Sequence, residues 1–366
     1  MLRFRSRRPK QAEATPGPEP VVVPIDPSEL VRQAEAAEAD GRFLDAIDLL
    51  RQANRDPDPD IELRLINLRH RAFDEVEQGV GRPSWPPVYA DLTPATPGPP
   101  EVVPAQLSSD VLGSALVNHG ALLIRGLADP AMVDELVSGI DRAFAGRDEW
   151  GNDPDAPTAP WFVPFVPIER HMPHDMSRHF VRQGGAVWAA DSPRVMFTML
   201  EAFDRVGLGD VISGYLGERP AISMRKCTLR RVPADLVYAG WHQDGAFLGA
   251  GVRSVNVWLA LTDCGGDADA PGLEYVPRRV DHVVETGAEG AAFDWSVGPG
   301  TVDQVVDQLD SEIIRPRFRA GDALLFDDLF LHRTATDPAL TQDRYAIESW
   351  FFAPSTYPRD QIPLVF

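Results

Sequence analysis

The chain has 366 residues, of which 44% are hydrophobic and 25% are charged, and no run approaches the roughly 20 apolar residues of a membrane helix. These features exclude an integral membrane protein or a wholly disordered chain. Acidic residues outnumber basic ones by 55 to 35, and the net charge of −20 opposes binding to nucleic-acid phosphates and to anionic lipids, so neither is expected as a partner. Only Cys227 and Cys264 occur, and no apolar signal segment follows the basic residues 1–10, which together indicate a cytoplasmic protein.

The N-terminal part divides into a leader and a small helical unit. Closely spaced prolines predict that residues 1–27 are disordered. Residues 28–82 repeat apolar side chains at helical spacing, with a helix capped by Ser28, a break at Gly41 and a last helix near 61–78, which predicts a helical hairpin extended by a third helix.

The stretch 41–57 resembles the second half of a tetratricopeptide repeat. Such repeats need neighbours to bury their faces, and only one unit is visible here. We therefore favour an appendage that docks on the main domain. Recruitment of a protein partner through this hairpin is the alternative.

Eight prolines between residues 83 and 104 predict an extended linker, which assigns residues 105–366 to the main domain. Helices are expected at 107–116, 130–144, 193–206 and 210–216. Strands are expected at 121–125, 222–231, 252–262, 273–276, 313–318, 323–326 and 345–352. Early helices followed by many antiparallel strands predict an α+β fold whose sheet closes into a barrel or jelly roll. All candidate metal and cosubstrate ligands lie beyond the linker, so residues 1–82 are expected to be dispensable for the chemistry.

Two segments of the main domain carry candidate metal ligands. In Trp241-His242-Gln243-Asp244-Gly245, an imidazole and a carboxylate stand two residues apart, and on an extended segment both side chains point to one face. His332 follows a buried strand and would complete a set of two histidines and one carboxylate, the ligand set of non-haem Fe(II) oxygenases. A single His-x-Asp is a weak signal, because most histidines have structural roles.

Arg344 and Thr334 lie shortly after His332 and suit a carboxylate ligand. A guanidinium can bind a carboxylate through two parallel hydrogen bonds, and a hydroxyl adds one donor. Together they are suited to the far carboxylate of a keto acid that chelates iron, which is the pattern of 2-oxoglutarate enzymes.

At these positions the chain resembles the phytanoyl-CoA dioxygenase family of Fe(II)/2-oxoglutarate oxygenases, over about residues 105–355. The resembling segments are 121–127, 241–245, 255–261, 271–277 and 320–334. Residues 277–282 depart from the family pattern, which leaves the role of that loop open.

The resemblance implies a double-stranded β-helix, a cupin-like jelly roll. It implies Fe(II) bound by His242, Asp244 and His332, and 2-oxoglutarate bound by Arg344 and Thr334. Trp258 and Thr228 would line the cosubstrate site. The implied reaction uses O2, releases succinate and CO2, and most commonly hydroxylates a small-molecule substrate.

Two other functions remain open. The first is a non-catalytic β-helix that serves as a binding or scaffold protein, against which the ordered set of ligands argues. The second is a Jumonji-type protein hydroxylase, in which a lysine from another strand usually holds the cosubstrate, so Arg344 argues against it. Halogenation is disfavoured because it needs a coordination site freed for halide, and Asp244 is present.

Three other groups of residues have a structural and a functional interpretation. His171, His174 and His179 are interpreted as a surface cluster in a proline-rich loop rather than as a second metal site. The alternating residues Lys226, Thr228 and Arg230 face either the active site or the outside of the sheet. The aromatic group Trp161, Phe162 and Phe165 forms either a lid or ordinary packing.

Overall fold

The computed structural model describes residues 26–77, 81–93, 97–168, 175–236, 240–249, 251–358 and 360–366. Of the predicted leader, only Asp26 and Pro27 lie among these residues, and they begin helix α1. Within the described parts of the chain, no helix is long and apolar enough to span a bilayer.

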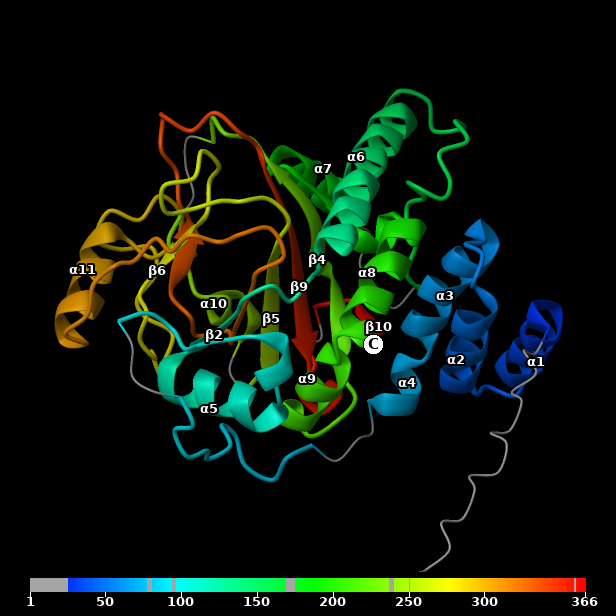
Figure 1. Ribbon diagram of the computed structural model, residues 1–366, viewed down its shortest axis with the longest axis horizontal. Helices are drawn as coiled ribbons and strands as arrows, with labels where there is room; N and C mark the ends of the chain where they lie inside the picture. Colours follow the sequence, from blue (N-terminus) through cyan, green and yellow to red (C-terminus); the bar gives the residue numbers. More distant parts are fainter. Residues whose placement is uncertain are drawn as a thin grey trace, which may run out of the picture.

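A large, mostly antiparallel sheet lies at the centre of the fold (Figure 1). Its strands follow the order β1-β2-β7-β5-β9-β4-β10, with β3 also paired to β4, and only β1 and β2 run parallel. They are β1 (Glu101–Val102), β2 (Ala121–Ile124), β3 (Ala186–Trp188), β4 (Ala221–Val232), β5 (Ser254–Ala260), β7 (Ala323–Phe326), β9 (Arg344–Phe352) and β10 (Pro363–Val365). A second, small sheet pairs β6 (Leu273–Tyr275) with β8 (His332–Thr334).

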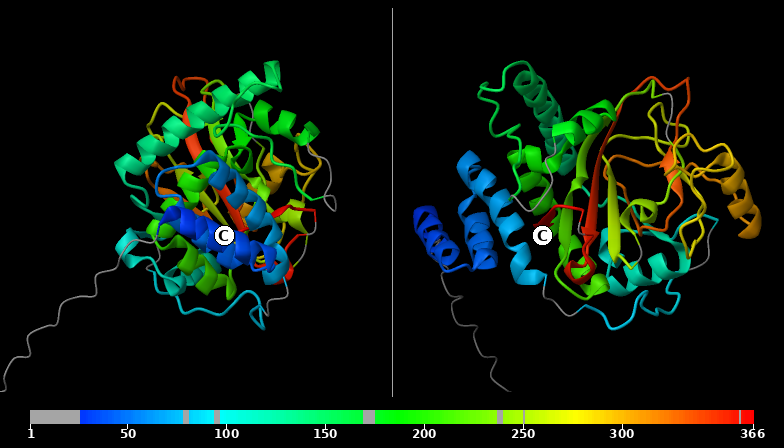
Figure 2. Two further views of the ribbon diagram at one scale, coloured as in Figure 1. Left: turned by 90° about the vertical axis from the view of Figure 1, so that its right-hand side faces the viewer. Right: turned by 180° about the vertical axis from the view of Figure 1, so that it is seen from behind.

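Alternation of side chains along the strands gives the large sheet two different faces. On the outer face, Val257 and Ile347 pack into the main core with four helices. These helices are α5 (Ser109–His119), α6 (Pro130–Asn152), α8 (Pro193–Arg205) and α9 (Leu208–Leu216). On the inner face, Trp258 and Leu324 pack in a second core with Tyr275 of the small sheet. The right-hand view in Figure 2 shows α6 and α8 (green) on one side of the large sheet, and the small sheet with the orange helix near residue 300 on the other.

The α+β class and the antiparallel sheet confirm the sequence prediction, but one predicted strand is wrong. Residues 313–318 make only isolated bridges, Ile314 with Tyr275 and Phe318 with Cys264. Pro316 lies between them and cannot donate a backbone hydrogen bond, which explains why no continuous ladder forms.

Several helices and strands differ from the prediction or were not predicted. Helix α6 extends eight residues beyond the expected end at 144. The unpredicted helices α7 (Asp175–Gln183) and α11 (Pro299–Gln308) flank the sheets, and α10 (Gly245–Leu248) follows the His-x-Asp segment. Strand β1 lies inside the range 83–104, so the sheet begins before residue 105.

The N-terminal helices pack on the edge of the large sheet at one end of the molecule (Figure 1). They are α1 (Pro27–Ala39), α2 (Phe43–Ala53), α3 (Pro59–Arg71) and the short α4 (Phe73–Val76). Asp26, rather than Ser28, caps α1, because Pro27 occupies the first helical position and the Asp26 carboxylate accepts from the Ser28 amide.

Helix α3 connects this helical unit to the sheet through buried polar contacts. The Arg69 guanidinium donates to the carbonyl of Val365 at 2.8 Å, and the His70 ring bonds the carbonyl of Pro363 at 2.9 Å. Apolar residues of α1 to α3 share a core with Ala221 and Val365. Deletion of residues 1–82 would uncover this core, so the structure argues against the expectation that the segment is dispensable.

We expect Arg69→Ala to lower the free energy of unfolding by about 2 to 3 kcal/mol, because it leaves the buried Val365 carbonyl without its donor and removes packed side-chain atoms. The control is Arg32→Ala, an exposed arginine of α1, which should change stability by less than about 0.5 kcal/mol. Urea unfolding of both variants measures the difference, and equal stabilities would contradict the docking of α3 through Arg69.

Candidate metal centre

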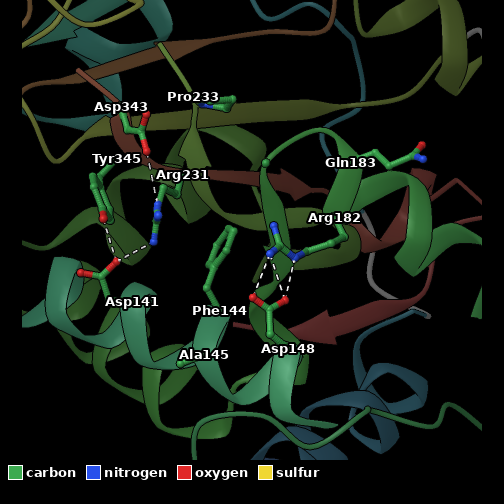
Figure 3. Close-up of a pocket in the computed structure, with 11 residues that line it drawn as sticks. Asp141, Phe144, Ala145, Asp148, Arg182, Gln183, Arg231, Pro233, Asp343 and Tyr345 are labelled. Carbon is green, nitrogen blue, oxygen red and sulfur yellow. Dashed lines mark hydrogen bonds and ion pairs between the residues drawn. The ribbon is translucent and has the colours of Figure 1, made fainter. Parts of the chain in front are cut away.

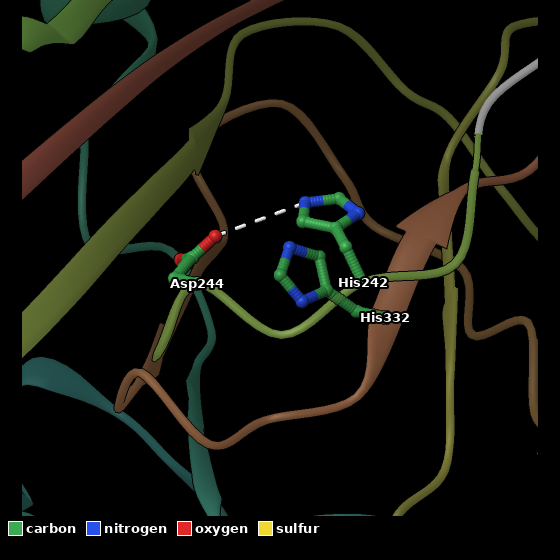
Figure 4. A group of neighbouring side chains, drawn as sticks. All are labelled: His242, Asp244 and His332. Atoms are coloured by element: carbon green, nitrogen blue, oxygen red, sulfur yellow. Dashed lines mark ion pairs between the residues drawn. The ribbon is translucent and has the colours of Figure 1, made fainter. Parts of the chain in front are cut away.

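Two histidines and one aspartate meet between the large and the small sheet (Figure 4). His242 precedes α10, Asp244 is its N-cap residue, and His332 begins β8. The backbones of His242 and His332 form an antiparallel bridge with N–O distances of 3.0 and 3.1 Å, which places the ring centroids 4.4 Å apart. The bridge therefore brings together two side chains that are distant in sequence.

The possible ligand atoms of the three side chains all lie within 4.8 Å of one another, and Nε2 of His242 is 3.7 Å from Oδ1 of Asp244. The residues thus meet as the sequence predicts, but the local geometry differs. Asp244 has helical backbone angles (φ −61°, ψ −30°), so it is the turn into α10, and not a continuing strand, that directs its carboxylate toward the imidazoles.

Backbone carbonyls define the tautomer of both imidazoles. Nδ1 of His242 lies 2.9 Å from the Gly240 carbonyl, and Nδ1 of His332 lies 2.9 Å from the Phe330 carbonyl. Since a carbonyl only accepts, each Nδ1 carries the proton and each Nε2 keeps a free lone pair. Burial also lowers the pKa of both rings, that of His242 to about 3, so both are neutral and able to bind a metal.

The Asp244 carboxylate is buried, and no arginine or lysine within the described ranges forms an ion pair with it. Its Oδ2 accepts a hydrogen bond from Asn256 at 3.2 Å. Burial raises the pKa of Asp244 well above its ordinary value, and the positive charge of Lys226 offsets this only in part. A divalent cation bound between Asp244 and the two rings would supply the missing charge. The donor set therefore fits a non-haem Fe(II) ion.

Arg344 is a buried guanidinium on the same, inner side of the fold. Its Nη1 donates to the carbonyls of Pro271 and Gly272 at 3.1 and 3.2 Å, while its Nε has no hydrogen-bond partner among the described residues. Burial lowers its pKa to about 10, and no carboxylate of the described chain forms an ion pair with it. A buried, unneutralised guanidinium of this kind fits an anionic ligand.

Thr334 and the two other predicted cosubstrate residues lie near Arg344 or along the same face. Thr334 pairs with Leu273 in the small sheet, and the next amide donates to the same Gly272 carbonyl that Arg344 uses. Trp258 has its ring 5.4 Å from the Arg344 guanidinium. Thr228 is buried, and its hydroxyl has no hydrogen-bond partner within the part of the chain that the structure describes.

Glu348 is a charged residue of this face that sequence reasoning missed. It lies opposite Thr228 on one side and opposite Trp258 on the other, so all three share the inner face. Its carboxylate pairs with Arg230 at 2.5 Å. Burial alone would raise the pKa of Glu348, but Arg230 and Lys226 hold it at about 2. Its spacing of four residues from Arg344 on one strand was the signal that could have identified it.

The sequence profile named "Phytanoyl-CoA dioxygenase (PhyH)" matches residues 116–338, more than half of the chain. The chain belongs to this family. The phytanoyl-CoA dioxygenase family is Fe(II)- and 2-oxoglutarate-dependent, so the chain is a 2-oxoglutarate-dependent oxygenase with iron and 2-oxoglutarate as its cofactors. No curated protein matches the chain in sequence.

Solved structures with a similar fold share little sequence with this family member. EctD from S. alaskensis, solved with 2-oxoglutarate and 5-hydroxyectoine, is 17% identical over 75% of this chain and 83% of that chain, with a TM-score of 0.45. AviO1 from Streptomyces viridochromogenes Tue57 is 15% identical over 66% and 92%, with a TM-score of 0.40. The carbocyclase SnoK from nogalamycin biosynthesis is 14% identical over 69% and 86%, with a TM-score of 0.42. Likeness of this degree says nothing of the substrate.

The aromatic group and the histidine group singled out in the sequence contribute no described residue to the metal centre of this oxygenase. Phe162 and Phe165 are buried in the main core, so they do not form a lid. His179 is exposed and contacts Gln183, whereas His171 and His174 lie outside the described residues.

A pocket of about 680 Å³ lies on the helix side of the large sheet (Figure 3). Tyr345 lines it and follows Arg344 directly, so the two side chains point to opposite faces of β9. Its charged groups neutralise one another, Arg231 with Asp141 and Arg182 with Asp148. The pocket is therefore separate from the metal centre.

We expect Asp244→Asn to stabilise the metal-free protein at pH 7. The raised pKa of Asp244 means that the native state keeps this proton to higher pH than the unfolded chain, so stability falls as the pH rises above about 4. A neutral amide removes the free-energy cost of ionising a buried carboxyl group. It should also remove the stabilisation that Fe(II) gives the wild type, since the metal loses an anionic ligand.

Anaerobic thermal unfolding at pH 5 and 8, with and without Fe(II), measures both effects. Asp267→Asn is the control, because that carboxylate is exposed and should leave the metal response unchanged. An Asp244→Asn variant that Fe(II) stabilises as much as it does the wild type would rule out Asp244 as a ligand.

Proposed function

We propose that this oxygenase hydroxylates a small-molecule substrate and releases succinate and CO2 at a centre built from His242, Asp244 and His332. The observation that carries the proposal is that a cluster of metal ligands and a buried guanidinium lie on the same, inner face of the large sheet. The possible metal-ligating atoms of two neutral imidazoles and a carboxylate converge, and the buried guanidinium of Arg344 is available for an anion. One site suits Fe(II) and the other suits the distal carboxylate of 2-oxoglutarate.

The protein's own groups have distinct tasks in this proposal. His242, Asp244 and His332 would hold the metal. Arg344 and Thr334 orient the cosubstrate, while Trp258 and Thr228 line its site. Bound Fe(II), with O2 and 2-oxoglutarate, supplies the oxidant that replaces a C–H bond by C–OH. The side chains position these partners.

The arrangement of the sheets supports a double-stranded β-helix as the fold. The small sheet faces the inner side of the large one, and isolated bridges at Ile314 and Phe318 extend the pairing between them. We retain the division into residues 28–82, the linker 83–104 and the oxygenase domain 105–366 as part of this proposal, with the last residues of the linker supplying strand β1 of the large sheet. A cytoplasmic location agrees with two free, buried cysteines.

The non-catalytic alternative is less favourable on physical grounds. A scaffold protein has no use for a buried carboxylate, two deprotonated Nε2 atoms and an unneutralised guanidinium, each of which costs stability. For a Jumonji-type hydroxylase, the anchor would be a lysine, which on the inner face would have to be Lys226. The buried Arg344 guanidinium is favoured instead, because its Nε has no hydrogen-bond partner among the described residues.

The direct test is conversion of 2-oxoglutarate to succinate by the purified protein. We expect turnover that requires both Fe(II) and O2, and we expect His242→Ala, Asp244→Ala and His332→Ala each to abolish it while keeping the fold. Succinate is quantified by mass spectrometry. Retained turnover in any of the three variants would refute the ligand assignment.

Arg344 provides a second test. Arg344→Lys keeps the charge but loses the two-pronged geometry, and Arg344→Ala removes one partner of a buried charge pair, which typically costs about 2 to 5 kcal/mol. We therefore expect Arg344→Ala to weaken 2-oxoglutarate binding about 30-fold or more, with Arg344→Lys in between. Anaerobic titration of the Fe(II) protein, followed by its metal-to-ligand charge-transfer absorbance, reports the affinity.

The matched control is Arg231→Ala. Arg231 lies on β4 opposite Tyr345, the residue after Arg344, but it lines the pocket on the helix side of the large sheet. Its 2-oxoglutarate affinity should equal that of the wild type. Unchanged affinity in Arg344→Ala would move the anchor elsewhere, with Arg230 and Lys226 as the remaining cations of the inner face.

A further inference from the structure

Lys226 is unusual in both sequence and structure. The chain contains 35 basic residues but only two lysines, Lys10 and Lys226, so Lys226 is the sole lysine within residues 26–366. It lies on β4, near the metal centre, where its charge acts on Asp244.

The Lys226 ammonium lies close to two aromatic rings. Its Nζ is 4.4 Å from the ring centroid of Trp350 and 5.0 Å from that of Phe247. Among the described residues, no hydrogen bond or ion pair reaches it. The rings stabilise the cation but do not neutralise it.

The two carboxylates whose charges act on Lys226 already have other partners. Glu348 is bound by Arg230, which donates from Nε at 2.7 Å, and by the indole of Trp350 at 3.2 Å. Asp244 is assigned to the metal in the proposed function. With Arg344 assigned to 2-oxoglutarate, Lys226 is a cation of the inner face that remains available for another anion.

An aromatic shelf, formed by Phe247, Phe293 and Trp295, lies beside Lys226 and His242. Phe247 and Trp295 each lie 6.2 Å from the His242 ring, and they are 5.4 Å from one another between centroids. Trp295 stacks on Phe293 at 5.2 Å, yet the two residues are 41% and 50% exposed. Exposed aromatic surface next to a metal ligand is suited to an apolar ligand.

Resting on the proposed function, we propose that the substrate is a small carboxylic acid with an apolar or aromatic body. Its carboxylate binds the Lys226 ammonium, and its body lies on the aromatic shelf beside His242. Phe247 contacts both Lys226 and His242, so it links the anion site to the metal centre. A single ammonium, with Arg230 already neutralised by Glu348, matches one carboxylate better than the double charge of a phosphate.

The test compares phenylacetate with its uncharged counterpart phenylacetamide. Binding of each to the anaerobic Fe(II)/2-oxoglutarate protein is measured by calorimetry. We expect phenylacetate to bind about tenfold tighter or more, as one charge-assisted hydrogen bond predicts. Lys226→Met should abolish this preference, and Lys226→Arg, which keeps the charge, should retain most of it.

Two further variants separate the charge from the shelf. Arg225→Met removes the same charge from the neighbouring position of β4, whose guanidinium donates to the Asp360 carbonyl at 3.4 Å, and should keep the preference for phenylacetate. Trp295→Ala should weaken both ligands by a similar factor, because it removes apolar contact and no charge.

The outcomes distinguish this inference from the function on which it rests. Equal affinity of the wild type for the two ligands, or a preference that survives Lys226→Met, overturns the inference alone. The inference is also overturned if Lys226→Met keeps the preference for phenylacetate but loses affinity for 2-oxoglutarate, because Lys226 would then bind the cosubstrate. A wild type that forms no charge-transfer band with Fe(II) and 2-oxoglutarate overturns the proposed function and the inference with it.

Discussion

The backbone bridge between His242 and His332 is the interaction on which the metal centre depends. It joins the segment before α10 to the first residue of β8 and sets the separation of the two imidazoles. A slip of one residue would turn one ring to the opposite face, because side chains alternate along extended chain. The large sheet, its helices and the small sheet can therefore be understood as the support that keeps these two short segments in register.

Around this bridge, the inner face carries charges that the protein leaves unneutralised. Among the described residues, Asp244 forms no ion pair with an arginine or lysine, and Arg344 and Lys226 form none with a carboxylate. Burial makes each of these states unfavourable. Elsewhere on the same face, Arg230 and Glu348 neutralise one another. We use this contrast to assign roles: charged residues in ion pairs stabilise the fold, and charged residues without an ion pair are available for ligands.

The sequence was sufficient where chemistry and pattern are local. His242, Asp244, His332 and Arg344 belong to short segments, and two neighbouring strands, β7 before His332 and β9 from Arg344 onward, have clear apolar patterns. Glu348 was missed because its role arises from cross-strand neighbours on β4 and β5, which only the sheet register defines. The docking of α3 likewise depends on its contacts with β10, almost 300 residues away in the chain. The strand predicted at 313–318 is wrong because its apolar alternation suggests a continuous ladder that a single proline prevents.

A crystal structure of the anaerobic Fe(II)/2-oxoglutarate complex tests the assignment of the inner face most directly. We expect one iron bound by Nε2 of His242, Nε2 of His332 and a carboxylate oxygen of Asp244, with the distal carboxylate of 2-oxoglutarate on Arg344 and the Lys226 ammonium still free. Iron bound elsewhere, or 2-oxoglutarate anchored on Lys226 instead of Arg344, would contradict that assignment.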